Sequence, residues 1–142
     1  MMTLHFRKAA QAVAVASLTV TALGTTTAAT AAPTAPAAAT QSCPSNGHLQ
    51  RGWSCTSLSN GQLHHRKGTN HVANTYYEKT SGGKTNVKLG INAGAGNKYK
   101  GSVSIKSGQT KTGSWSVDYC KVSLGLMVSG GTYQTPPTHC NT

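Results

Sequence analysis

The sequence predicts a small all-β domain, an antiparallel β-sandwich of six to eight short strands held by two disulfides. Several stretches alternate apolar and polar residues with period two, and none has a persuasive helical period. Turn residues recur at roughly 8–12-residue intervals, as in sandwiches and barrels, so a closed barrel stays open as the alternative. All four cysteines follow residue 42.

The chain begins like an exported protein. Arg7 and Lys8 precede an uncharged apolar run over residues 9–24, which is shorter than the roughly 18–20 residues that a membrane span needs. Small residues follow, and Ala29-Thr30-Ala31 offers a cleavage site. We therefore predict a secretory signal peptide over residues 1–31 and a secreted, extracellular product.

The segment after the predicted cleavage site, residues 32–41, consists of Ala, Pro and Thr up to a final Gln. Such a composition cannot build a core, so we expect a disordered linker. The remaining residues, 42–142, form one domain of about 100 residues, a size at which exported domains commonly need disulfides. We expect a monomer with no membrane span.

The even number of cysteines predicts two disulfides, for which three pairings exist. Cys43–Cys55 and Cys120–Cys140 are the favoured pairs because each closes a modest local loop. Each would stabilise the fold by about 3 kcal/mol. The interleaved pairings stay open at this point.

Along the chain, the first strand signals are weak. His48, Leu49 and Trp53 predict a short strand inside the first disulfide loop, and Ser59-Asn60-Gly61 predicts a tight hairpin turn. Residues 72–79 are rich in β-formers and predict a longer strand.

The next segments alternate more regularly. Val87 to Ile91 predicts a strand with a basic outer face, and Tyr99 to Ile105 predicts another in which Lys100 and Lys106 point outward. Residues 132–135 predict a last short strand, which Pro136-Pro137 ends because proline has no N–H to donate.

The stretch from Trp115 to Val128 carries the strongest alternation. Its parity changes between Tyr119 and Cys120, so we expect a bulge or a corner there. Asp118 would lie on this strand, opposite its apolar side. Because the domain has no phenylalanine, we expect Trp115, Tyr119 and one tyrosine of the Tyr76-Tyr77 pair in the core, although exposed aromatics could instead stack sugars or bases.

Two glycine-rich segments resemble nucleotide-binding loops only superficially. Residues 81–85, SGGKT, lack the first glycine of a phosphate loop because Glu78 stands there, and Gly94-x-Gly96 is followed by Tyr99 in place of a third glycine. We interpret both as hairpin turns.

The charge is the clearest functional signal. Thirteen Lys and Arg residues face two acidic residues, and after loss of Arg7 and Lys8 the formal charge is near +9. Such a domain is drawn to polyanions, although the same charge could serve solubility alone. We predict an anionic polymer or cell-wall surface as the partner, with unspecific nucleic-acid binding also possible, and the following binding residues: Lys88, Lys98, Lys100, Lys106, Arg66 and Lys67.

The histidines suggest one alternative. His64, His65 and His71 could supply two imidazoles for cleavage of a phosphodiester, or could bind a metal weakly. In a strand, His64 and His65 would point to opposite faces, and no spacing matches a known metal site. We therefore predict no metal, no cofactor and no catalytic residue.

Other chemistry finds little support. Glu78 and Asp118 are the only carboxylates, and we expect both to pair with nearby lysines on the surface. The sequence thus favours binding over catalysis. A secreted His-dependent nuclease and a protein-binding module, such as a protease inhibitor with the Cys43–Cys55 segment as its rigid loop, are the alternatives.

Overall fold

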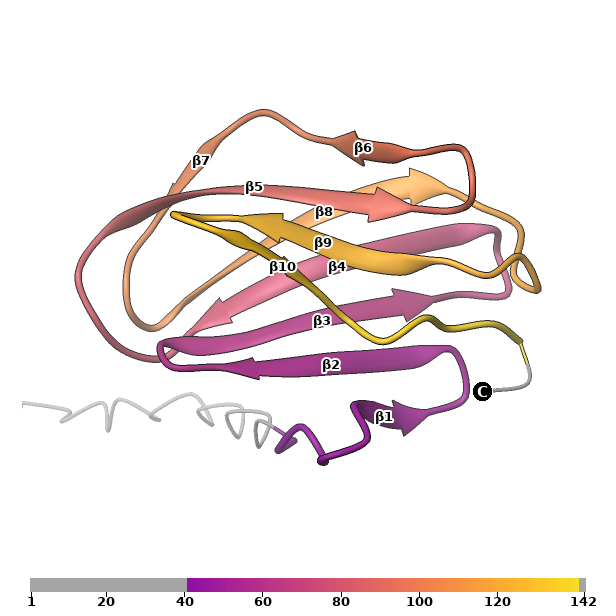
Figure 1. Cartoon of the computed structure of the whole chain (residues 1–142), viewed down its shortest axis with the longest axis horizontal. Helices are drawn as coiled ribbons and strands as arrows, with labels where there is room; N and C mark the ends of the chain where they lie inside the picture. Colours follow the sequence, from indigo (N-terminus) through magenta and orange to yellow (C-terminus); the bar gives the residue numbers. More distant parts are fainter. Residues whose placement is uncertain (1–40, 141–142) are drawn as a thin grey trace, which may run out of the picture. The chain divides into compact units, whose positions relative to one another are not determined.

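The computed structural model describes residues 41–140, and these residues form two sheets of antiparallel strands (Figure 1). The all-β prediction is confirmed. The predicted signal peptide and almost all of the predicted linker lie outside the described residues. Within residues 41–140, no helix has the length and apolar character needed to cross a membrane.

The first sheet has the strand order β1-β2-β3-β4-β8. The Asn60-Gly61 turn joins β2 to β3 as predicted, and Gly61 has a positive φ of 156°. The strands of this sheet are β1 (His48–Gln50), β2 (Trp53–Leu58), β3 (Gly61–Lys67), β4 (Val72–Lys79) and β8 (Gln109–Ser116).

The second sheet has the order β10-β9-β5-β6, and β7 also pairs with β5. Its central strand β5 carries the alternating Val87, Leu89 and Ile91, all of which are buried. The strands of this sheet are β5 (Thr85–Asn92), β6 (Asn97–Tyr99), β7 (Val103–Ile105), β9 (Leu124–Val128) and β10 (Thr132–Gln134).

The hydrophobic core draws on both sheets. Leu63 and Tyr77 from the first sheet join residues of β5, β7 and β9, including Ile105 and Met127, and Trp115 and Leu58 pack against this cluster. Of the three predicted core aromatics, Tyr77 is buried and Trp115 is half-buried. Tyr119 lies in a loop, where its ring is close to Gly52.

The expected number of six to eight strands is wrong, because the described residues form ten. The run from Tyr99 to Ile105 was expected to be one strand, but it is two. β6 pairs with residues 90–92 of β5 and β7 with residues 85–87, and the register shifts by one residue between them, as at a bulge. The main-chain N–H of Lys100 still donates to the carbonyl of Leu89 over 2.9 Å.

The stretch from Trp115 to Val128 also divides, as the parity change predicted. β8 ends at Ser116, β9 begins at Leu124, and residues 117–123 form a loop that leads from the first sheet to the second. Asp118 therefore lies in this loop, and its expected place on a strand is wrong. A strand that leaves one sheet for the other must lose its old partners, which explains why the alternation cannot continue.

The two glycine-rich segments differ in the structure. Residues 93–96 join β5 to β6 within one sheet, as the predicted hairpin turn. The expected hairpin at residues 81–83 is wrong, because β4 and β5 belong to different sheets and this segment crosses between them. In the sequence, both ends of this segment look like the ends of two strands joined by a hairpin. The sequence does not show the crossing, because the partner of each strand is set by residues far away in the chain.

Both favoured disulfides are present, Cys43–Cys55 and Cys120–Cys140. The first fastens the segment before β1 to β2. The second fastens the loop over residues 117–123 to the segment that follows β10, so it limits the freedom of a loop between the two sheets.

Candidate functional site

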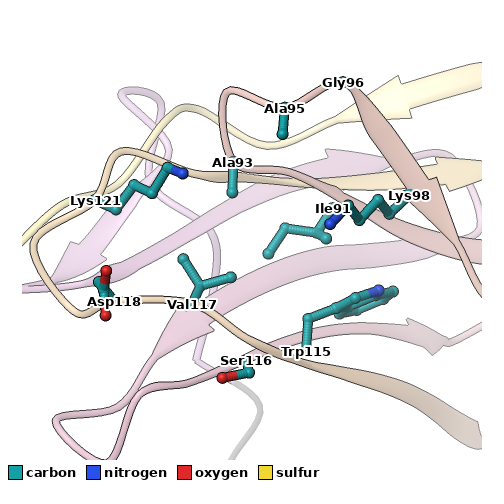
Figure 2. A pocket seen from close by; sticks show the side chains of 10 residues that line it. All are labelled: Ile91, Ala93, Ala95, Gly96, Lys98, Trp115, Ser116, Val117, Asp118 and Lys121. Carbon is teal, nitrogen blue, oxygen red and sulfur yellow. The ribbon is translucent and has the colours of Figure 1, made fainter.

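A cleft of about 450 Å³ opens between the β5–β6 hairpin and the chain that follows β8 (Figure 2). We call it the Trp115 cleft. The hairpin and the end of β8 lie at the same end of the two sheets, on the right in Figure 1. The hairpin contributes a mostly apolar side, formed by Ile91, Ala93, Ala95, Gly96 and the stem of Lys98.

Trp115 supplies the aromatic surface of the cleft. It is an inward-facing residue of β8, paired with Ala73, and its indole folds back over Gly113. A Cβ atom at Gly113 would lie 2.6 Å from the indole Cη2 atom, so the ring can occupy this position only above a glycine. The Lys100 ammonium lies 5.5 Å from the centroid of the ring, within the range of a cation–π contact.

Two ammonium groups give the cleft its charge. Lys98 extends from the hairpin and Lys121 from the loop over residues 117–123. Figure 2 shows them on opposite sides of the cleft, Lys98 above the indole and Lys121 nearer Val117. Asp118 also lines the cleft, but its carboxylate lies 3.2 Å from Nδ1 of His71. The ion pair of Asp118 is thus with His71, although the expected lysine neighbour is also present, since Asp118 raises the pKa of the Lys67 ammonium. The two lysines of the cleft carry charge that this carboxylate does not fully offset.

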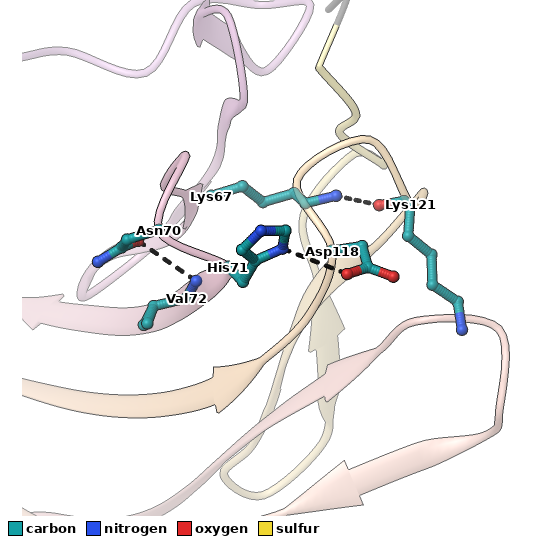
Figure 3. Close-up of polar contacts among 6 residues, drawn as sticks. All are labelled: Lys67, Asn70, His71, Val72, Asp118 and Lys121. Carbon is teal, nitrogen blue, oxygen red and sulfur yellow. Dashed lines mark hydrogen bonds and ion pairs between the residues drawn. The ribbon is translucent and has the colours of Figure 1, made fainter.

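The loop that bears Asp118 and Lys121 is fixed by the turn between β3 and β4 (Figure 3). Lys67 donates a hydrogen bond from Nζ to the main-chain carbonyl of Lys121, and the main-chain N–H of Val117 donates to the carbonyl of His71 over 2.9 Å. His71 has a positive φ of 59°, which is uncommon for a residue with a side chain. The Cys120–Cys140 disulfide adds a covalent link to the same loop.

The orientation of β6 differs from the expectation. Tyr99 pairs with the outward-facing Gly90 and covers it, and a Cβ atom at Gly90 would lie 2.4 Å from the tyrosine ring. Because side chains alternate along a strand, Lys98 and Lys100 then lie on the side of Ile91 and Trp115. The prediction that Lys100 points away from the core side is wrong, because Tyr99 takes the outer side, where Gly90 leaves room for its ring.

The predicted binding residues do not form one patch. Lys98 lines the Trp115 cleft and Lys100 lies against its indole, whereas Lys88 and Lys106 are exposed but do not line it. Arg66 lies on the opposite face of the first sheet, where its guanidinium is 4.2 Å from the centroid of the Trp53 ring.

Lys67 does not offer a free charge at the surface. Its side chain is 3% exposed, and burial lowers the pKa of its ammonium while nearby Asp118 partly offsets this. Lys67 therefore contributes to the cleft only indirectly, by its hydrogen bond to the loop over residues 117–123.

The histidines are dispersed. His64 stacks on Tyr76 on the outer face of the first sheet, with ring centroids 4.6 Å apart, and burial lowers its pKa. His65 faces the other way and is fully buried. His71 lies in the β3–β4 turn, beside Asp118. In the part of the chain that the structure describes, no three His, Cys, Asp or Glu side chains are grouped as a metal ion would require.

Sequence reasoning missed Lys121 as a site residue and favoured a core role for Trp115 over stacking on sugars or bases. One signal in the sequence could have pointed to them. Trp115 and Lys121 stand on either side of the parity change after Tyr119, and a corner there leaves side chains exposed at the end of a sheet. Comparisons with protein-family models, with curated proteins and with solved structures give no match, so the site is interpreted from its own geometry.

Proposed function

We propose that this protein is a small secreted sandwich domain that binds anionic cell-envelope or extracellular polymers without catalysis. One observation carries the proposal: the Trp115 cleft places the ammonium groups of Lys98 and Lys121 on opposite sides of an apolar floor. An acidic polymer could place a carboxylate or phosphate between these groups.

The aromatic ring narrows the class of ligand. An indole face stacks on sugar rings, and its surface is apolar enough to favour a ring over a bare ion. An acidic glycan combines the ring with the negative charge. The mature chain's formal charge near +9 would add long-range attraction to such a polymer at low salt.

The test measures retention on an insoluble acidic wall polymer as salt is raised. Lys98→Gln and Lys121→Gln should each weaken binding by about threefold and lower the salt needed for elution, as expected for a partly exposed charge pair. Lys121→Gln keeps the main-chain carbonyl that Lys67 contacts, so the loop has no reason to move.

Lys84→Gln is the matched control, because it removes the same charge at an exposed residue that does not line the cleft. An equal loss of binding in all three variants would mean that only the net charge of the protein matters, and would contradict the proposal that the Trp115 cleft is the binding site. Cleavage of RNA that His71→Ala abolishes would contradict the absence of catalysis.

A further inference from the structure

A second cleft, of about 260 Å³, lies at the other end of the sheets. The β2–β3 turn, the end of β4, the start of β5 and the β9–β10 turn meet there, on the left in Figure 1. It shares no lining residue with the Trp115 cleft. Its volume is just below the range of clefts that hold drug-sized ligands, so it suits a single small group.

Lys79 gives this second cleft its charge. It is the last residue of β4, its side chain is 2% exposed, and it lines the cleft. Between residues 41 and 140 no ion pair involves Lys79, and the pair of His71 with Asp118 lies at the opposite end. A lysine that lines a cleft with no carboxylate beside it suits a bound anion, because the anion would supply the opposite charge.

Hydroxyl groups complete the lining. Ser59, Thr85, Ser129 and Tyr133 contribute side-chain hydroxyls, and the Thr85 and Ser129 oxygens lie 3.4 Å apart. Burial, and then the neighbouring Tyr133, raise the pKa of the Tyr77 phenol, so this group also stays protonated and able to donate. No carboxylate lines the cleft.

The crossing segment holds the charged group in place. Gly82 has a positive φ of 78°, and a Cβ atom there would lie 3.4 Å from Nζ of Lys79 and 3.2 Å from Oδ1 of Asn60. The main-chain N–H of Thr80 donates to the carbonyl of Asn60 over 2.9 Å. The ammonium thus lies close to the main chain of Gly82, in a residue that lines the cleft.

We propose that this second cleft binds one small oxyanion group, a carboxylate or a phosphate or sulfate ester, that belongs to a hydroxylated molecule. Nζ of Lys79 supplies the opposite charge, and the hydroxyls of Thr85 and Tyr133 donate hydrogen bonds. Ammonium and hydroxyl donors around an oxyanion form charge-assisted hydrogen bonds, which are the stronger ones in proteins. The Trp115 cleft plays no part in this binding.

The experiment titrates the purified protein with inorganic phosphate, sulfate or acetate at constant ionic strength, with chloride as the balancing ion, and follows main-chain amide shifts by NMR. We expect saturable shifts at Asn60, Thr85 and Ser129. Lys79→Met keeps the bulk of the side chain and should weaken binding about tenfold, since it removes a charged partner. Lys84→Gln should leave the titration unchanged.

A phosphate or sulfate response without an acetate response would assign the site to esters, and the reverse would assign it to carboxylates. Shifts that do not saturate with any of the three ions, or that survive in Lys79→Met, would overturn the proposal. If Lys79→Met does not fold, Thr85→Val and Tyr133→Phe each remove one hydroxyl and should each weaken binding about fivefold. The double variant Lys98→Gln, Lys121→Gln should keep the titration, which separates this site from the proposed polymer binding.

Discussion

His65 places an ionisable ring between the two sheets, where it is 0% exposed. Nδ1 forms a hydrogen bond with Oγ1 of Thr75 over 3.1 Å, and Nε2 with Oγ of Ser123 over 2.9 Å. One ring nitrogen donates and the other accepts, so the neutral imidazole is fully bonded. Burial, and then the charge of nearby Lys67, lower its pKa from 6.5 to about 4.

This pKa predicts a loss of stability in mild acid. Between pH 6.5 and pH 4 the unfolded chain holds a proton at His65 that the folded chain does not hold, so acidification favours unfolding. The contribution of neutral His65 to the free energy of unfolding is fully present above pH 6.5 and is lost by pH 4, a total of about 3 kcal/mol. Urea unfolding at several pH values should show this decline.

The matched variants are His65→Gln and His71→Gln. The first should reduce the decline, whatever its effect on stability at pH 7, but not abolish it, because burial also lowers the pKa of His64. The second leaves the buried His65 ring in place and should keep the His65 part of the decline. The chain has only two carboxylates, so the acid transition is not dominated by Asp and Glu. A decline that is identical in His65→Gln and in the unchanged protein would contradict the assignment.

At the scale of elements, β9 approaches the first sheet at Gly125. A Cβ atom at this position would lie 2.9 Å from Cβ of His65 and 2.9 Å from Cγ2 of Thr75. The main-chain N–H of Gly125 also donates to Oγ1 of Thr135 over 3.0 Å. The glycine therefore sets the distance between β9 and the β3–β4 pair, and with it the hydrogen bond between Ser123 and His65.

Gly125→Ala should lower the free energy of unfolding by about 2 kcal/mol, because a methyl group inserted into a packed interior forces neighbouring atoms apart. Chemical denaturation measures the change. Gly101→Ala is the control, since a Cβ atom there would have no neighbour within 4 Å. Equal stability of the two variants would show that the sheets can separate without cost.

At the scale of the whole molecule, the two clefts lie at opposite ends of the sheets, and each contains lysine. The corner over residues 117–123 builds one end, and the crossing between β4 and β5 contributes to the other. The two proposed binding sites thus lie where the chain changes sheets, because strand ends expose side chains that the sheets would otherwise cover.

Export is the prediction that concerns the whole chain. The full-length sequence, expressed in a host that secretes proteins, should release a product that begins at or near Ala32 and whose mass reflects two disulfides. Intact-mass spectrometry of the culture medium, before and after reduction, measures both properties. Free thiols at Cys43, Cys55, Cys120 and Cys140 would contradict the export proposal, as would a product that stays in the cell.

Residue order alone determined much of this fold. Local alternation and turn residues located β4, the β2–β3 hairpin and the corner after Tyr119, and short spacing indicated both disulfides. These features depend on neighbours in the chain, so a local pattern records them. The net positive charge is likewise a property of composition.

Tertiary structure alone decided which strands became partners. β4 pairs with β8 and β5 with β9, across long separations, and these choices turned the 80–84 segment into a crossing. They also brought the end of β8, with Trp115, beside the β5–β6 hairpin, whose own register places Tyr99 on Gly90 and Lys98 on the side of Ile91. Alternation indicates that the two faces of a strand differ, but the surroundings of each face depend on distant residues. For that physical reason the candidate site could not be predicted from the sequence.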